Sequence, residues 1–389
     1  MKILGVVSSH RYSKISDSRL DKVLTSVDIV DAVYDIGYKG KVSNSQALLL
    51  AAMCGVNKSG ADVEIIYPGQ PIPQNFDGVV LSTPVYFGDR SSYLHDFIRN
   101  TDLTDKAVGI VSVGAKRNGG QETTNIYALY DSLDKGALIT GNGPPTAQYG
   151  GTGWAGNKTS IVSDDFGIKT SYGTGSQVAK LAKLIKSPES IRKPNILLLV
   201  VTEDKIDFSF VSKFKNSNVK ILDVTKENIK RCVACPVCPN GDLDAKYTCI
   251  IPNDGMYRMY DDIIAADGVI FVSGTNDTNF QVFIERTRFI RRNHFEWSER
   301  VYSSLSETES ITDILPIRIM TNLLRQNMFG LPFFRKCRGF TNMDFDIYID
   351  MVEKYTRKSI TLRKDSSTDF EYKAVGYEDA KRNEKAYRD

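Results

Sequence analysis

Residues 77–81 read DGVVL and residues 267–271 read DGVIF, so one short, apolar, β-branched pattern occurs twice in the chain. Each copy is followed by an apolar pair on a predicted helix, at residues 97–98 after the first copy and 283–284 after the second. Around both copies, short strand-like runs alternate with helical segments, an order typical of parallel strands joined by crossover helices. The sequence therefore predicts two tandem, doubly wound α/β domains with parallel sheets.

The positions of strands, helices and prolines divide the chain. In the first half, strands are predicted at residues 3–7, 63–66, 79–81, 108–113 and 138–140, and helices near 47–53, 123–133 and 177–185. Pro188 and Pro194 mark a linker, after which residues 195–201 form a new buried-strand pattern. We expect a first domain over 1–187, a second over 194–358, and a charged C-terminal tail over 359–389.

Length and composition exclude several classes of protein. A chain of 389 residues, 41% hydrophobic and 25% charged, suits two ordinary globular domains. A net charge of +3 gives no reason to expect a nucleic-acid or membrane-surface partner, and the arginines at 286–292 are expected to form a solvated helix face. No apolar run reaches the roughly 18 residues of a membrane span, and the chain opens on a strand rather than a signal peptide. We expect a cytoplasmic protein.

Four segments that follow predicted strands are rich in hydroxyl, glycine or aromatic residues: 8–13, 82–88, 112–123 and 149–153. Each alone has an ordinary structural explanation, as a polar loop, a packed aromatic or a glycine turn. The carboxyl ends of parallel strands lie at one edge of a sheet, where open α/β sheets bind ligands and glycine allows the backbone to approach them closely. Their order together predicts a ligand site at this edge.

This order of motifs resembles the NAD(P)H-dependent FMN and quinone reductases of the flavodoxin-like superfamily. The similarity covers about residues 1–186 and includes SNSQALL at 43–49, PVYFG at 84–88 and GGQET at 119–123. It implies a flavodoxin-like fold, a bound FMN, and NAD(P)H as a candidate reductant. The FMN ligands that it implies are Ser9, Arg11, Asn44 and Ser45 for the phosphate, and Pro84, Val85, Tyr86, Phe87, Gly88, Ser112, Gly114, Gly120 and Gln121 for the ring.

The sequence departs from that family in one place. Residues 12–42 are inserted between the arginine of the first loop and the Ser-Asn-Ser helix start, where the family has a compact loop. The insertion is long enough to form a lid or an interface arm. It leaves open which residues form the phosphate cradle.

Four of the six cysteines cluster in one short segment, as Cys232-x2-Cys235-x2-Cys238-x10-Cys249. Two-residue gaps let thiolates of one tight loop converge on a common centre, a spacing typical of iron-sulfur sites. Structural zinc more often uses two separated pairs of ligands, although zinc and free or catalytic thiols stay open. The spacing favours a [4Fe-4S] cluster.

The cysteine segment also resembles that of iron-sulfur flavoproteins, including the residues that follow it at 254–256 and 266–270. The flavin loop, however, is replaced by residues 273–276, and acidic residues at 203–204 stand where a phosphate loop is expected. Acidic side chains repel a phosphate. We expect the second domain to hold the cluster and to have lost the flavin.

These patterns together predict an FMN-dependent oxidoreductase that passes electrons between a reductant, a [4Fe-4S] cluster and FMN. Alternatives are an NAD(P)H quinone or flavin reductase with structural zinc, and a non-catalytic flavin electron carrier that docks on a partner. The expected partners are a redox protein or a small-molecule substrate, and a second copy in a homodimer or higher homo-oligomer. Electron transfer further requires that the cysteine loop lie near an FMN, within the chain or across a homodimer interface.

Overall fold

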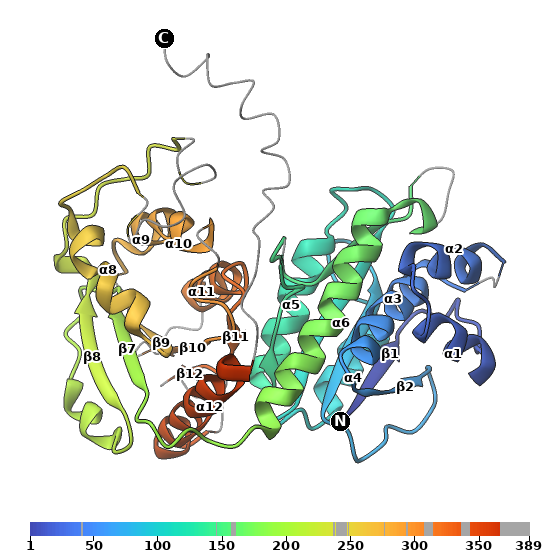
Figure 1. The fold of residues 1–389 in the computed structure, drawn as a ribbon, viewed down its shortest axis with the longest axis horizontal. Helices are drawn as coiled ribbons and strands as arrows, with labels where there is room; N and C mark the ends of the chain where they lie inside the picture. The colour runs from blue at the N-terminus through green and yellow to red at the C-terminus, as the bar shows by residue number, and fades with distance from the viewer. Residues whose placement is uncertain are drawn as a thin grey trace, which may run out of the picture. The chain divides into compact units, whose positions relative to one another are not determined.

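The computed structural model describes residues 1–39, 42–144, 146–156, 161–235, 238, 247, 249–275, 277–292, 295–306, 314–335 and 343–365. The chain forms two compact units (Figure 1). Unit 1 comprises Met1–Gly143, Ala147–Lys186 and Phe329–Pro332; unit 2 comprises Pro144–Thr146, Ser187–Met328 and the chain from Phe333 onward. The main break, between Lys186 and Ser187, lies next to the predicted linker, but the units are not continuous in sequence, because each takes a short segment from the other half.

The sheet of unit 1 has the flavodoxin-like strand order. Its strands are β1 (Lys2–Val7), β2 (Asp62–Ile66), β3 (Gly78–Pro84), β4 (Ala107–Gly114), β5 (Leu138–Ile139) and β6 (Gly151–Trp154). Strands β2-β1-β3-β4-β5 are parallel neighbours in that order. The fifth position is shared, because β5 pairs with the start of β4 and β6 pairs with its end. A short strand from the second half, β11 (Phe329–Gly330), pairs antiparallel with β5.

Helices α3 (Asn44–Lys58) and α6 (Asp165–Lys186) pack side by side against the sheet of unit 1 (Figure 1). Their backbones touch: a Cβ at Gly175 would lie 1.7 Å from the carbonyl oxygen of Ala52, and one at Gly55 would lie 2.1 Å from that of Tyr172. Only glycine fits at these two positions. Helices α4 (Ser92–Asn100) and α5 (Gln121–Asp134) pack against each other and follow β3 and β4.

The predicted insertion at 12–42 contains two helices, α1 (Asp17–Leu24) and α2 (Ile29–Lys39), which pack on α3. The thiol of Cys54 donates to the carbonyl of Val23 at 3.1 Å, and the side-chain amide of Asn57 donates to that of Leu24 at 3.1 Å. Burial raises the pKa of Cys54 to about 12, so this thiol stays protonated.

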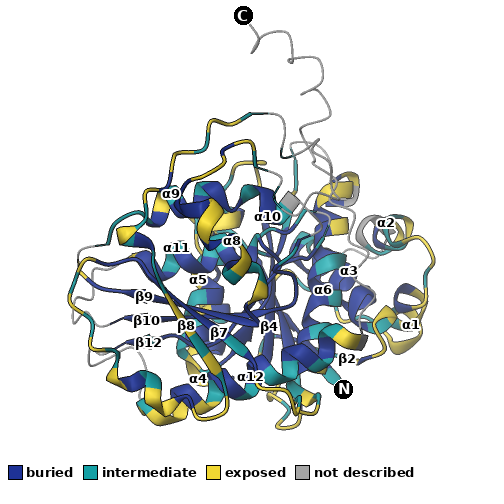
Figure 2. Cartoon of the chain, turned by 60° about the vertical axis from the view of Figure 1, so that its left-hand side comes forward, coloured by how far each residue is buried: buried dark blue, intermediate teal, exposed yellow. Residues whose placement is uncertain are grey.

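Unit 2 repeats the strand order of unit 1. Its strands are β7 (Asn195–Val200), β8 (Asn218–Asp223), β9 (Gly268–Ser273), β10 (Val301–Ser306) and β12 (Phe334–Arg335), parallel in the order β8-β7-β9-β10-β12. Strand β8 is largely exposed, whereas β7, β9 and β10 are buried (Figure 2). The two units thus share a flavodoxin-like topology.

The connections of unit 2 differ from those of unit 1. Its helices are α8 (Gly255–Ala265), α9 (Phe280–Arg286), α10 (Arg288–Arg292), α11 (Leu315–Leu324) and α12 (Phe345–Asp365). Between β7 and β8, where every residue is described, the chain forms only the 3₁₀ turn η2 (Phe208–Lys213). Helix α12 runs beyond residue 358, so the first residues of the predicted tail are helical. Within the described ranges, no helix is both long and apolar enough to cross a membrane.

The aspartate that opens each sequence repeat joins distant parts of its unit. In unit 1, Asp77 accepts the backbone N–H of Lys2 at 2.9 Å and an ion pair from Lys186, the last residue of α6, at 2.7 Å. The next residue, Gly78, lies so close to β4 that a Cβ would be 2.8 Å from the carbonyl oxygen of Ala107. Asp77 therefore ties the first strand and the last helix to the start of the third strand.

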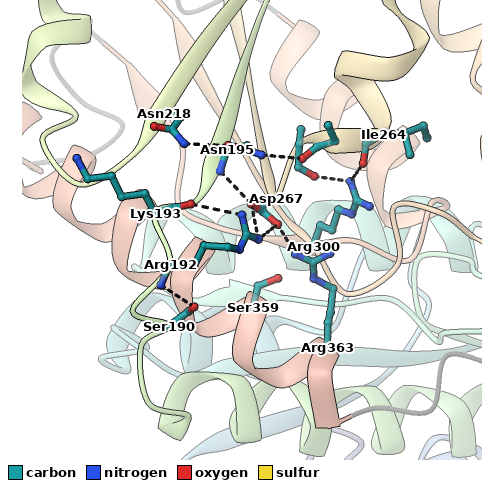
Figure 3. Close-up of polar contacts among 12 residues, drawn as sticks. Ser190, Arg192, Lys193, Asn195, Asn218, Ile264, Asp267, Arg300, Ser359 and Arg363 are labelled. Atoms are coloured by element: carbon teal, nitrogen blue, oxygen red, sulfur yellow. Dashed lines mark hydrogen bonds and ion pairs between the residues drawn. The ribbon is translucent and has the colours of Figure 1, made fainter.

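Asp267 makes the same connections in unit 2 (Figure 3). It accepts the backbone N–H of Asn195 at 2.9 Å and the guanidinium of Arg363, near the end of α12, at 2.8 Å. Arg192 of the linker adds two further hydrogen bonds, at 2.8 and 2.9 Å. Burial opposes ionisation of Asp267, but these donors outweigh it and lower its pKa.

Replacing Asp267 with asparagine should lower the free energy of unfolding of unit 2 by about 1–3 kcal/mol at pH 7, because charged hydrogen bonds are lost. The pKa of Asp267 is lower in the folded state, so its stabilisation is present above the ordinary value of 3.8 and is lost as pH falls through the folded value. Urea unfolding followed by fluorescence of Trp297, buried in unit 2, measures the effect in a Trp154→Phe background.

The matched control is Asp262→Asn, which breaks the exposed ion pair with Lys220. It should cost less than about 1 kcal/mol. Equal losses of unfolding free energy in the Asp267 and Asp262 variants would show that the hydrogen bonds of Asp267 do not hold unit 2 together.

Candidate functional site

Three loops meet at the carboxyl edge of the sheet of unit 1. They follow β1 at residues 8–13, β3 at 84–91 and β4 at 114–121. These strands are parallel and adjacent, so their loops emerge at the same edge.

Gln46 holds the first loop against the start of α3. Its buried side-chain amide accepts the N–H of Ser13 at 3.1 Å and donates to the carbonyl of the same residue at 2.7 Å. The hydroxyl of Ser43 caps α3 by accepting the N–H of Gln46 at 3.3 Å. The insertion at 12–42 therefore leaves the loop and the helix start adjacent. Gln46 was not among the predicted ligands, although it belongs to the quoted motif at 43–49.

The four predicted phosphate ligands lie on these two neighbouring segments. The hydroxyl of Ser9 accepts the N–H of Arg11 at 3.2 Å, and the side chain of Arg11 is exposed. Asn44 accepts the N–H of Ile161 at 3.1 Å, and Ser45 is buried in the first turn of α3. A helix start beside a hydroxyl-rich loop with an arginine has the chemistry of an anion site. The individual roles of the four residues stay predictions.

The second loop is a tight turn that presents aromatic rings. Tyr86 and Asp89 exchange two backbone hydrogen bonds, at 2.8 and 3.0 Å. Between them, Phe87 and Gly88 have left-handed φ angles of 52° and 83°, as the tight two-residue turn requires. The side chain of Tyr86 is 57% exposed and that of Phe87 is fully exposed. These rings are available to a ligand or to another molecule.

Arg90 fixes the base of this turn. Its buried guanidinium bonds the carboxylates of Asp89, at 3.3 Å, and of Asp131. It also lies 3.0 Å from Nδ1 of His95. The exposed turn is therefore anchored to α4 and α5.

The third loop contacts the second. Gly120 has a φ of 94°, and a Cβ there would lie 2.7 Å from Cα of Gly88. Gln121 is buried: its amide donates to the carbonyls of Lys116 at 2.7 Å and Gly153 at 3.0 Å, and accepts the N–H of Gly119 at 2.8 Å. The side chain of Gln121 thus shapes the loop.

Two further predicted ring contacts lie inside this loop. A Cβ at Gly114 would lie 2.8 Å from the Gln121 amide, so glycine makes room for that side chain. The hydroxyl of Ser112 is buried and donates to the carbonyl of Gln121 at 3.0 Å. Both residues support the loop, and a direct contact with a flavin ring stays a prediction for them.

The corresponding edge of unit 2 is filled by a carboxylate. Asp204 accepts hydrogen bonds from the backbone N–H of Thr275 and from its hydroxyl, the latter at 2.8 Å. A Cβ at Gly274 would lie 2.3 Å from an oxygen of Asp204, so this glycine makes space for the acidic side chain. These contacts are compatible with the predicted loss of the flavin from the second domain, which stays a prediction.

The cysteine segment of unit 2 lies between β8 and α8. Cys232, Cys235, Cys238 and Cys249 are partly exposed, and none of them forms a disulfide among the described residues. In the part of the chain that the structure describes, no group of three or more Cys, His, Asp or Glu side chains is gathered to hold a metal ion. Residues 236–237, 239–246 and 248 lie outside the described residues. The donor set has the chemistry of a thiolate metal site, but its geometry stays a prediction.

Arg286 joins the two ends of the cysteine loop. It forms a fully buried ion pair with Asp254, which caps α8. It also donates to the carbonyl of Lys230 at 2.8 Å and to the hydroxyl of Tyr247 at 2.8 Å. Burial opposes ionisation of Asp254, yet the bond from Arg286 lowers its pKa. The prediction that the arginines at 286–292 form a solvated helix face is therefore wrong for Arg286. The spacing of apolar residues in the sequence did not indicate that this side chain is buried.

Comparison with known proteins gives matches to flavoproteins. Residues 1–127 match the family model described as NADPH-dependent FMN reductase. An iron-sulfur flavoprotein of Methanocaldococcus jannaschii is 39% identical over 117 residues, which cover 28% of this chain and 61% of that protein. An iron-sulfur flavoprotein of Methanosarcina thermophila is 30% identical over 121 residues, which cover 28% of this chain and 58% of that protein.

The chain thus spans less than two thirds of the length of the curated relatives that it matches. Among solved structures, a flavone reductase aligns at 16% identity over 47% of this chain and 63% of the other, with a TM-score of 0.31. That similarity is too low to support an argument.

Replacing Gly120 with alanine should destabilise unit 1 more than the same change at Gly60. Both residues have positive φ angles, 94° and 79°, so both variants incur the left-handed penalty of about 1–2 kcal/mol. Only at Gly120 does the new Cβ meet a neighbour, which should add about 1–3 kcal/mol. Urea unfolding of the two variants measures the difference. Equal losses of unfolding free energy in the Gly120 and Gly60 variants would mean that the loops at 84–91 and 114–121 move apart without cost.

Proposed function

Because the first unit of this chain belongs to the flavodoxin-like NADPH-dependent FMN reductase family, we propose that the protein is an FMN-dependent oxidoreductase. The observation that carries the proposal is the contact between the first loop and the start of α3 through Gln46. It brings the hydroxyl-rich loop, Arg11 and the helix N-terminus to one edge despite a long insertion. The exposed aromatic turn and the glycine loop lie at the same edge.

The residues present fit FMN. Ser9, Arg11, Asn44 and Ser45 would hold the terminal phosphate, which the N-terminal amides of α3 favour. The turn at 84–88 and the loop at 114–121 would border the ring, and their contact at Gly88 and Gly120 sets the space between them. Bound FMN supplies one-electron or two-electron transfer, and the protein orients and shields it. A nicotinamide nucleotide is the proposed reductant.

FMN should bind in preference to FAD, because unit 1 offers a terminal-phosphate site and no dinucleotide fingerprint. Arg11→Ala and Asn44→Ala should each weaken FMN by about 1.5–3 kcal/mol, the contribution of a hydrogen bond to a charged group, or roughly tenfold to a hundredfold in Kd. Quenching of flavin fluorescence on titration with the apoprotein measures Kd.

Arg19→Ala, on α1 of the insertion, is the matched control and should leave Kd unchanged. Tighter binding of FAD than FMN, or unchanged affinity in both test variants, would contradict the proposed phosphate site.

We further propose that Cys232, Cys235, Cys238 and Cys249 hold a [4Fe-4S] cluster that exchanges single electrons with the flavin. The names of the two relatives support this, as do the absence of disulfides among these four described cysteines and the bonds from Arg286 that join the two ends of the loop. A structural zinc is the alternative for the same thiols. The acceptor would be a redox protein or a small molecule, and the protein would act as a homodimer or higher homo-oligomer.

Cys235→Ser should abolish bound iron and acid-labile sulfide while FMN stays bound, because no cysteine of the loop belongs to the flavin site. Metal analysis and flavin extraction of anaerobically prepared protein measure both cofactors. Cys54→Ser, at the buried thiol of unit 1, is the control and should keep the iron. Zinc in place of iron and sulfide would support the structural-zinc alternative, and loss of FMN together with iron would show that the metal holds the fold.

A further inference from the structure

A cavity of about 420 Å³ opens in unit 1 between the two helices of the insertion, α1 and α2. The residues that line it lie between positions 19 and 36, so it is separate from the proposed flavin ligands and from the cysteine segment of unit 2. Its charged and apolar lining has three parts: a cationic wall of Arg19 and Lys22 on α1, an acidic wall of Asp31 and Asp35 on α2, and an apolar floor of Val23, Ala32 and Ile36.

The two helices that carry these walls are anchored on α3. The carbonyls of Val23 and Leu24, at the end of α1, accept hydrogen bonds from the side chains of Cys54 and Asn57, both at 3.1 Å. On α2, the side chain of Val33 is fully buried. The cavity is therefore bounded by two helices whose positions are fixed by their contacts with the body of unit 1.

Each wall brings two like charges together. Arg19 and Lys22 are three residues apart, and the aspartates of the acidic wall are four apart, spacings that make side chains neighbours on a helix. None of the residues three or four positions from Arg19 or Lys22 is acidic. Like charges at these spacings destabilise a helix. An opposite charge supplied from the cavity would offset this repulsion on each helix.

The two walls do not neutralise each other by direct contact. The side chains from 17 to 36 are all described, and no ion pair joins the cationic wall to the acidic wall. Because the two walls carry equal and opposite charge, a simple anion or a simple cation is attracted by one wall and repelled by the other. A molecule that carries both signs at its two ends is attracted by both walls.

We propose that this cavity binds a zwitterionic small molecule of the α-amino-acid class with an apolar side chain. Its carboxylate pairs with the cationic wall and its ammonium group pairs with the acidic wall. Its side chain covers the apolar floor, of which Val23 is buried and Ala32 and Ile36 are partly buried. The site depends neither on a bound flavin nor on a metal in the cysteine segment.

L-Leucine is the probe, and isothermal titration calorimetry of the full chain should give a saturable binding curve. L-Leucinol keeps the ammonium group but lacks the carboxylate, and N-acetyl-L-leucine keeps the carboxylate but lacks the ammonium group. Each should bind about tenfold more weakly than leucine, because one wall loses its partner. Glycine should also bind more weakly, because it has no side chain to cover the apolar floor.

Two variants test the walls separately. Lys22→Met and Asp31→Asn should each weaken leucine binding about threefold to tenfold, since each removes one charge from an exposed wall. The matched controls are Lys135→Met and Asp62→Asn, which remove one exposed charge of each sign elsewhere in unit 1. Both controls should bind leucine as the unmodified protein does.

The absence of saturable leucine binding, or equal affinity in the test variants and the controls, would overturn the site. Binding of leucinol or N-acetylleucine as tight as that of leucine would overturn the assignment to a zwitterion. Displacement of leucine by FMN would show that leucine occupies the flavin site instead. Titration of the same preparations with FMN tests the proposed function separately, because leucine binding is expected whether or not FMN binds.

Discussion

The carboxylate that opens the third strand of each sheet is the constraint on which both units depend. Asp77 and Asp267 each accept the first amide of the first strand of their unit and a cation from the last helix of their unit. These first strands, β1 and β7, lie one place in from the edge of the strand order, next to β2 and β8. One carboxylate therefore fixes the amino end of the first strand of each unit to the start of its third strand. The recurrence of DGV at these two places has a physical reason in both units.

At the opposite, carboxyl edge of the sheet of unit 1, further side chains hold the loops in place. Each of its three loops is held by a buried polar side chain: Gln46 for the first, Arg90 for the second and Gln121 for the third. Such side chains are costly to bury unless their hydrogen bonds are made, and most of the hydrogen bonds of these three side chains go to backbone groups or carboxylates. The loops are thus ordered by the protein before any ligand contributes. The residues that are exposed at this edge include aromatic rings and cations, residue types that a flat, phosphorylated ligand uses.

The sequence predicted β1, β3 and β4 of unit 1 well because buried parallel strands are continuous apolar runs, whereas β10 and β12 of unit 2 were not predicted. The run at residues 79–81 became β3, and that at 108–113 became β4, each with a few residues added at its ends. Strand β6 was missed, because Gly151-Thr152-Gly153-Trp154 has no β-branched apolar residue and is held as a strand only by its pairing with β4. Periodicity also failed for Arg286, since burial of a guanidinium depends on Asp254 and Lys230, which are distant in sequence. Motif spacing located the loops of the site, but it could not distinguish side chains that face a ligand from those, such as Gln121, that build the loop.

The two units share a strand order but differ in the segments that connect the strands. Between β1 and β2, unit 1 has α1, α2 and α3, and between β2 and β3 it has a plain loop, residues 67–77. Between β7 and β8, unit 2 has only a 3₁₀ turn, and between β8 and β9 it has the cysteine segment and α8. The connection after β7 thus offers no α-helix N-terminus, and Asp204 is already bound to the loop after β9, so these two connections lack the features that favour a phosphate. Arg286 and Asp254 then stabilise a loop that has no counterpart in unit 1. One arrangement of strands can thus support two different sets of connections, because the sheet fixes only where the connections start and end.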